Sequence, residues 1–416
     1  LPQRRFGDLL PVRAGRIGEV VHSRPMLQLA LGVALGISLT EQFALPIATT
    51  LVLGLLGLIL GLSLPTWVWL AFGLAIGAAR YELWRSPPVQ TPPPTATLRA
   101  IGTLEPTRNG YRVLCAFVEP ELATYTLVYF RPNVENLPDY GDVFRIEATW
   151  RRPTRIGSFD WGKFLERRRV YHITTVFSEG QFQILESDAG RWQRFFSRAR
   201  RSLRETLQAH LDPDSAALME GILVGATGDF PPQLREAFHH AGTGHLLATS
   251  GLHVAIALHL VYFLLRWTPT PFAGRVVLVI IAAWCYALLA GLRPSIVRAA
   301  TMASCALCAP LVGREADSLN ALGFAGALWL LIAPYAIFEV GFQYSFCAVL
   351  FILLFYSRLE RTLRQTMRSV GIPPTVDKTA RTPLHLLGLF AHKLLIPLLS
   401  VSLCAQAGIS LVQLYH

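Results

Sequence analysis

The sequence predicts a polytopic α-helical membrane protein with an inserted small β-barrel domain on the extracytoplasmic side. Its 416 residues have a mean hydropathy of +0.40 and are 52% hydrophobic. Only 16% are charged, whereas ordinary soluble domains carry about 25%. Long apolar segments flank a polar stretch, residues 97–185, whose short alternating segments are typical of strands.

Residues 1–94 are predicted to form N-terminal transmembrane helices followed by a linker. Three apolar segments lie at residues 26–40, 43–62 and 64–80. A membrane-spanning helix needs about 20 residues, so the first and third segments indicate tilted or re-entrant helices. We expect no cleavable signal peptide, because the basic N-terminal region leads into segments that continue as spans. The proline-rich residues 87–94 predict a stiff linker.

Residues 95–190 are predicted to form a separate β-domain. Five short segments alternate in hydropathy and are separated by Gly, Pro and Asn residues: RVLCAFV, YTLVYF, DVFRIEATW, HITTVF and QFQIL. About five strands of this length favour a small barrel.

Residues 191–242 are predicted to form amphipathic interfacial helices. In residues 191–210 the large apolar side chains recur at helical spacing: Trp192, Phe195, Phe196, Ala199, Leu203 and Leu207. Five arginines are expected mainly on the other faces: Arg191, Arg194, Arg198, Arg201 and Arg204. Such a helix suits a membrane surface, where guanidinium groups meet lipid phosphates. A second interpretation is a basic collar that attracts DNA through Arg198 and Arg201.

Residues 243–416 are predicted to form an incomplete channel domain of six apolar segments: 243–265, 274–291, 295–312, 318–333, 336–357 and 390–414. Basic residues are concentrated near the N-terminus and in residues 358–393. Because basic loops stay on the cytoplasmic side, both regions are predicted to be cytoplasmic and the β-domain extracytoplasmic. The end of the chain just past an apolar segment suggests a fragment or a naturally shortened version of a longer protein.

Polar residues punctuate these apolar segments in three motifs: HLLATSGLHV at 245–254, GLRPSIVRAA at 291–300 and EVGFQYSF at 339–346. Ionisable and polar groups inside a membrane are costly, so they are candidates for a functional path. The candidates are His245, Ser250, Gly251, His253, Arg293, Ser295, Arg298, Gln343 and Ser345. A structural role remains open for both histidines, and Arg298 has Glu315 and Glu339 as alternative ion-pair partners.

These motifs, together with GSFDWGKFLERRRV at 157–170, resemble in sequence and order those of the competence DNA-uptake channel family (ComEC). The resemblance implies that the chain carries one DNA strand across the inner membrane of a bacterium during natural transformation. It also implies an OB fold for the β-domain, a barrel that often binds single strands. The candidate DNA-binding residues are Arg151, Arg152, Arg155, Lys163, Arg167, Arg168, Arg169, Arg198 and Arg201. A solvated basic surface is the alternative interpretation.

The same resemblance implies several partners: single-stranded DNA, membrane lipids, a cytoplasmic helicase or DNA-binding protein, and a periplasmic DNA receptor. Full-length family members usually carry a nuclease domain of the metallo-β-lactamase type. Its HxHxDH metal motif is absent from these residues, so we expect no metal, no cofactor and no enzymatic activity here. No phosphate-binding loop occurs in the sequence, which predicts that another protein supplies the driving force.

Two other functions remain open. Ser250 and His253 could form an intramembrane serine hydrolase, although the segment offers no acidic third member and no G-x-S-x-G turn. The formal net charge of +11 equally suits a transporter of another anionic polymer or a lipid-linked glycan.

Overall fold

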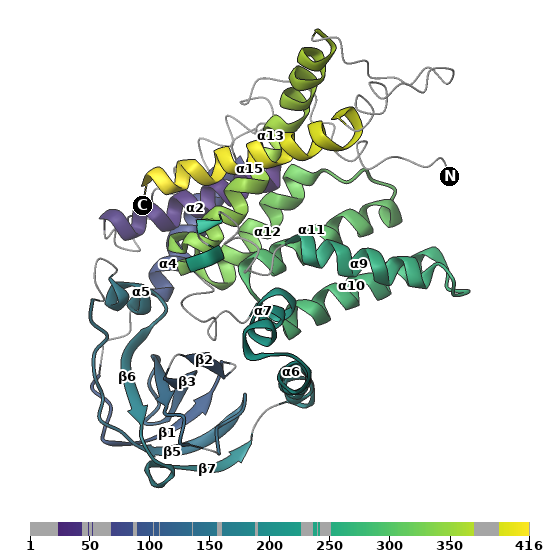
Figure 1. Ribbon diagram of the computed structural model, residues 1–416. Coiled ribbons are helices and arrows are strands. Elements are labelled where there is room, and N and C mark those ends of the chain that lie inside the picture. The colour runs from purple at the N-terminus through teal and green to yellow at the C-terminus, as the bar shows by residue number, and fades with distance from the viewer. Residues whose placement is uncertain are drawn as a thin grey trace. The chain divides into compact units, whose positions relative to one another are not determined.

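The computed structural model describes residues 24–43, 49, 52, 68–85, 90–102, 104–107, 109–134, 136–155, 160–187, 190–225, 236–238, 240–241, 251–369 and 391–415. The chain divides into two compact units. One comprises residues 1–82 and 301–416, and the other comprises residues 83–300. The unit of residues 83–300 contains all the labelled strands and helices α5 to α10 (Figure 1).

Within the described residues, the strands form one seven-stranded mixed sheet in the order β6-β4-β3-β1-β5-β7, with β2 paired to β3. The strands are β1 (Thr95–Ala100), β2 (Glu105–Thr107), β3 (Gly110–Glu119), β4 (Tyr125–Phe130), β5 (Asp142–Glu147), β6 (Val170–Val176) and β7 (Phe182–Ser187). β4 and β6 run parallel, and the other pairs are antiparallel. We call strands β1–β7 with the short helix α5 (Trp161–Arg167) the β-domain.

The segment that follows β5 turns back onto the far edge of this sheet. Arg151 forms a bridge with Ile173 of β6, and the Thr174 hydroxyl donates a hydrogen bond to the carbonyl of Thr149. β5 and β6 are distant in the strand order, so these contacts curl the sheet toward closure. Large apolar side chains fill its interior, among them Leu98 and Phe144, which are both fully buried.

The five strand segments expected from the sequence correspond to β3, β4, β5, β6 and β7, but the expected number of strands was too low. β1 and β2 were not predicted. Leu98 is the one large apolar side chain that β1 buries, and its other buried residues, Ala96, Thr97 and Ala100, are small, so the strand is inconspicuous in the sequence. Helix α5 was also not predicted, although Asp160 caps it by accepting a hydrogen bond from the Lys163 amide.

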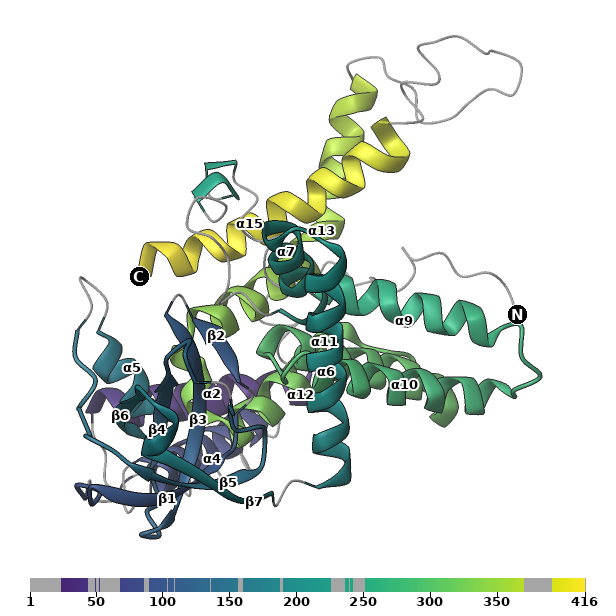
Figure 2. The same ribbon diagram turned by 60° about the horizontal axis from the view of Figure 1, so that its bottom comes forward.

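Among the described residues, the unit of residues 83–300 also contains α6 (Arg191–His210), α7 (Pro213–Val224), α9 (Gly251–Leu265) and α10 (Phe272–Leu289). Figure 2 shows α6 and α7, which pack against each other. α6 is amphipathic, as expected. Arg204 lies half-buried against α7, where it forms an ion pair with Glu220.

The Arg204–Glu220 ion pair is predicted to stabilise the packing of α6 on α7, and this can be tested. Two guanidinium nitrogens of Arg204 lie 2.7 and 2.9 Å from Glu220 Oε1, and only 6% of the Glu220 side chain is exposed. Removing one partner of a buried ion pair costs about 3–5 kcal/mol. We therefore expect Glu220→Ala to speed amide hydrogen exchange in α6 by about two orders of magnitude or more. Glu205→Ala, at an exposed position of α6, is the control. Equal exchange in both variants would contradict this role.

The other unit contains the described helices α2 (Pro25–Phe43), α12 (Ser318–Ile332), α13 (Val340–Ser369) and α15 (Ile396–Tyr415), together with most of α4 (Val68–Trp84). α2 packs on α12, and α13 packs on α15. Asp317 caps α12 and forms an ion pair with Arg24, whose Nε lies 2.9 Å from the carboxylate. Short helical turns occur at 179–181, 309–312, 334–338 and 391–395. Helix α11 (Pro294–Cys308) crosses the boundary between the units.

Five described helical segments are long and apolar enough to cross a membrane: 25–43, 272–289, 295–312, 340–369 and 392–415. Two shorter apolar helices occupy residues 253–265 and 318–332. Each predicted apolar segment from 243 onward overlaps a described helix, whereas most of 43–62 lies outside the described residues. α13 extends well past its predicted end at residue 357. Its added turns carry charged pairs such as Glu360–Arg364 at i,i+4 spacing, which support a polar helix.

Candidate nucleic-acid interface

Two of the polar motifs meet where α9 begins. A Cβ atom placed on Gly251 would lie 3.3 Å from the Nη2 atom of Arg298 and 3.5 Å from the Cβ of Ala299. Glycine therefore gives the guanidinium of α11 room to lie against the first turn of α9. His253 lies half-buried on α9. The predicted site residues His245 and Ser250 lie outside the described residues.

The turn between α10 and α11 shapes the second motif. Gly291 and Leu292 both have positive φ angles, +75° and +51°, a conformation that favours glycine at the first position. The amides of Gly291 and Leu292 donate to the carbonyls of Leu288 and Ala287, which ends α10. The carbonyl of Arg293 then accepts the first amide hydrogen bonds of α11. Arg293 and Ser295 are half-buried here, one turn before Arg298.

Arg200 of α6 binds this same turn and was missed by the sequence analysis. Its guanidinium donates to the carbonyls of Leu288 and Leu289, at the C-terminal end of α10. A cation is favourable at that end of a helix. Burial, followed by the nearby charges of Arg293 and Arg204, lowers the pKa of Arg200 to about 10. Arg200 therefore remains charged at neutral pH, although it is crowded by other cations.

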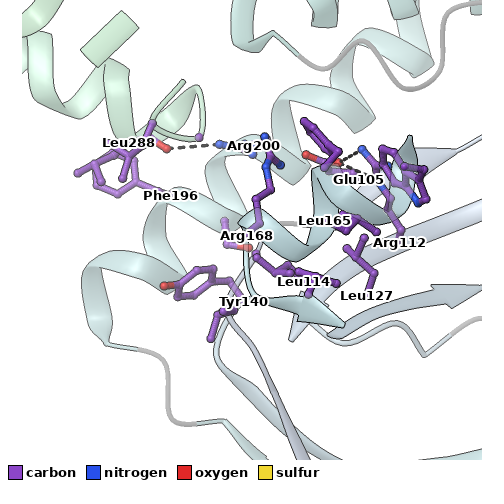
Figure 3. Close-up of a pocket in the computed structure, with 18 of the residues that line it drawn as sticks. Glu105, Arg112, Leu114, Leu127, Tyr140, Leu165, Arg168, Phe196, Arg200 and Leu288 are labelled. Carbon is purple, nitrogen blue, oxygen red and sulfur yellow. Dashed lines mark hydrogen bonds and ion pairs between the residues drawn. The ribbon is translucent and has the colours of Figure 1, made fainter. Parts of the chain in front are cut away.

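A pocket of about 720 Å³ opens beside Arg200, between the β-domain, α6 and the turn after α10 (Figure 3). We call it the α6 pocket. Four charged side chains line it: Glu105, Arg112, Arg168 and Arg200. Five aromatic side chains also line it: Tyr140, Trp161, Phe164, Trp192 and Phe196. Its volume lies within the range of about 300–1,000 Å³ typical of small-molecule sites.

Planar side chains are layered on one wall of the α6 pocket. The rings of Trp161 and Phe164 are stacked, with centroids 5.3 Å apart and an angle of 20° between their planes. The guanidinium carbon of Arg168 lies 4.4 Å from the centroid of Phe164. Glu105 is paired with Arg112 at 2.7 Å, so the lining keeps a surplus of positive charge. Such a wall suits a flat, anionic ligand.

The predicted DNA-binding residues of the β-domain differ in their surroundings. Arg151, Arg152, Arg155 and Lys163 are exposed, whereas Arg167, Arg168 and Arg169 are half-buried. Arg169 donates to the backbone carbonyls of Leu83 and Trp84 and lies over the Trp84 ring. Burial, together with the charge of Arg152, lowers the pKa of His172 on β6. Of these predicted residues, only Arg168 lines the α6 pocket.

The remaining predicted site residues lie elsewhere. On α6, Arg198 and Arg201 are exposed, and Arg201 forms an ion pair of 2.8 Å with Asp139. Gln343 and Ser345 belong to α13 in the other unit. The Gln343 amide nitrogen donates to the carbonyl of Ile337 at 2.7 Å. No group of three or more His, Cys, Asp or Glu side chains is arranged as a metal site among the residues that the structure describes.

Two known proteins are similar to part of the chain. A segment of 231 residues, 55% of the chain, is 29% identical to ComE operon protein 3 of Bacillus subtilis (strain 168) and covers 29% of that protein. A segment of 145 residues, 34% of the chain, is 32% identical to an uncharacterized protein of Aquifex aeolicus (strain VF5) and covers 34% of it. The matches thus span about a third of these relatives. No solved structure matches the chain.

The family model described as Competence protein matches residues 222–416. This range leaves out the motif at 157–170, which also resembles that family in sequence. It includes the motifs around Gly251, Arg298 and Gln343. Residues 222–416 thus match the family that was expected from those motifs.

Proposed function

We propose that this protein is an inner-membrane channel that carries single-stranded DNA into the cytoplasm during natural transformation. The observation that carries the proposal is the contact between Gly251 and Arg298. It joins two family motifs and holds a cation beside the first turn of α9, within apolar helices. The match of residues 222–416 to the Competence protein family model supports the same role.

A DNA strand is a flexible polyanion, so its path needs positive groups that bind phosphate weakly enough to release it. Arg298 would be such a group, with Arg293, Ser295 and His253 beside it and Gln343 and Ser345 elsewhere on the path. His245 and Ser250 are proposed to line the same path. The proposed role is transport rather than catalysis, with force supplied by a cytoplasmic helicase or DNA-binding partner.

The β-domain is proposed to be an OB-type barrel on the extracytoplasmic side, where it receives the strand from a periplasmic receptor. Its parallel β4–β6 pair and the bridge from Arg151 to Ile173 support a curled, closing sheet. The exposed cations around Arg152 and Lys163 would contact phosphates. Arg169 is proposed to contribute by fixing the barrel to Leu83 and Trp84, since its donors bind the backbone carbonyls of these residues.

The proposal is tested by deleting the gene in a naturally transformable host that encodes this chain. We expect transformation by exogenous duplex DNA to be lost and DNA to accumulate outside the inner membrane. Expression of the chain from another locus should restore transformation. Electroporated plasmid DNA should enter the deletion strain normally, which controls for viability and plasmid replication. Unchanged natural transformation after deletion would contradict the proposed function.

A further inference from the structure

The α6 pocket brings together chemistry that the transport path of apolar helices does not require. Its walls come from the β-domain, α6 and the turn after α10, all within the unit of residues 83–300. Aromatic and guanidinium groups face the same cavity, as Arg168, Phe196 and Arg200 do in Figure 3. The pocket therefore offers flat faces and positive charge to one ligand.

The charges of the α6 pocket favour an anion. Arg112, Arg168 and Arg200 face it together with one carboxylate, Glu105, which is already paired with Arg112. Arg200 is also close to Arg293 and Arg204, and burial, followed by the charges of these two arginines, lowers its pKa. A phosphate bound nearby would relieve the repulsion among these cations. The pocket is thus suited to a group that carries negative charge.

The aromatic side chains of the pocket favour a ligand that also has a flat face. The layered side chains of Trp161, Phe164 and Arg168 present planar surfaces. Trp192 lines the pocket from α6 and is 76% exposed, so its ring is accessible to a ligand. Every nucleobase has a flat face, and base–aromatic stacking is tolerant of sequence. A nucleotide combines the flat face and the negative charge that this lining favours.

We propose that the α6 pocket receives an unpaired nucleobase and so lets the protein select single-stranded over duplex DNA. This inference rests on the proposed function and adds the site of strand selection. In a duplex each base is stacked and paired, and turning one outward costs a few kcal/mol. A single strand offers its bases without that cost. A duplex could contact the exposed cations but not fill the pocket.

The test compares two DNA polymers of equal charge with the full chain in detergent micelles. One is a fluorescent thymidine 20-mer, and the other is an abasic 20-mer with the same number of phosphates. Because each stacked base contributes about 5- to 150-fold in affinity, we expect the thymidine polymer to bind at least about fivefold more tightly. A 20-base-pair duplex should compete poorly with it.

Two variants on α6 test whether the preference for the thymidine polymer over the abasic polymer arises in the α6 pocket. Trp192→Ala removes an aromatic side chain that lines the pocket, whereas Phe195→Ala removes one that is 60% exposed outside its lining. We expect Trp192→Ala to lower the ratio of thymidine to abasic affinity severalfold and Phe195→Ala to leave it unchanged. Both positions are exposed, so neither change should unfold the protein. An equal loss in both variants would overturn the assignment to the pocket.

Other outcomes separate this inference from the proposed function. Equal binding of thymidine and abasic polymers would overturn base recognition and leave DNA transport standing. Failure to bind either polymer would count against both. A preference abolished by phosphatidylglycerol, but not by phosphatidylcholine, in the micelles would reassign the pocket to an anionic lipid and overturn the inference.

Discussion

Replacing Arg298 by alanine is expected to lower the arrival of labelled DNA in the cytoplasm by about ten- to a hundredfold. This range corresponds to the loss of a charge-assisted hydrogen bond worth about 1.5–3 kcal/mol. Arg298 lies in an apolar helical segment and contacts the first residue of α9, where two family motifs meet. The measurement is the amount of labelled strand in the cytoplasm, with uptake into the periplasm recorded in the same cells.

Two further variants control for misfolding. Arg314→Ala removes an exposed arginine from the loop that follows α11 and should leave DNA arrival unchanged. Arg298→Lys keeps the positive charge but loses the planar fork of donors, so it should transfer DNA at an intermediate level. Normal arrival in Arg298→Ala, at normal protein level, would remove Arg298 from the proposed path.

Replacing Gly36 by leucine is expected to have the largest effect on folding. Gly32 and Gly36 of α2 face Gly73 and Gly77 of α4, so each helix presents a G-x-x-x-G pair to the other. A Cβ on Gly36 would lie 2.2 Å from the carbonyl oxygen of Leu74, well inside contact distance. Small residues allow this close backbone approach between membrane helices. A leucine must therefore force α2 and α4 apart.

The effect is measured as the amount of monodisperse protein extracted in detergent and as the temperature at which half of it aggregates. We expect Gly36→Leu to lower both. Gly341→Leu is the matched control, because a Cβ at that position meets no atom within 4 Å. If Gly36→Leu were extracted as well as the wild type and were equally stable to heat, the close pairing of α2 and α4 would be wrong.

The sequence predicted the parts of the fold that depend on local patterns. Long apolar segments indicated α10, α11 and α13 because length and hydropathy suffice to identify such helices. Alternating segments indicated β3 to β7 for a similar reason. β1 was missed because Leu98 is the one large apolar residue that it buries. α13 proved longer because it continues beyond its apolar part in turns that carry the Glu360–Arg364 ion pair.

The candidate site was harder to predict than the fold, because it depends on contacts between residues that are distant in the sequence. Arg298 was singled out because an arginine is rare in an apolar helix, but its contact with Gly251 comes from the packing of α11 near α9. Arg200 resembles its neighbouring arginines in sequence. Only the packing of α6 against α10 distinguishes it, since that contact brings its guanidinium to the carbonyls of Leu288 and Leu289.

The α6 pocket could not be predicted either, because it too is formed by residues that are distant in the sequence. Its lining is drawn from positions between Ile101 and Leu292, which only the tertiary structure brings together. The basic residues of the β-domain were predicted as one set. Their surroundings separate Arg168, which lines the pocket, from Arg169, whose donors bind backbone carbonyls. Composition cannot make this distinction, because both residues belong to the same run of arginines.

The most direct test of single-strand transport follows the two strands of one duplex separately. Duplex DNA carrying a different label on each strand is given to competent cells that contain or lack this protein, and cytoplasmic label is measured before replication. We expect each imported molecule to deliver one label only, and no label to arrive without the protein. Arrival of both labels as a duplex, or equal arrival with and without the protein, would contradict the account.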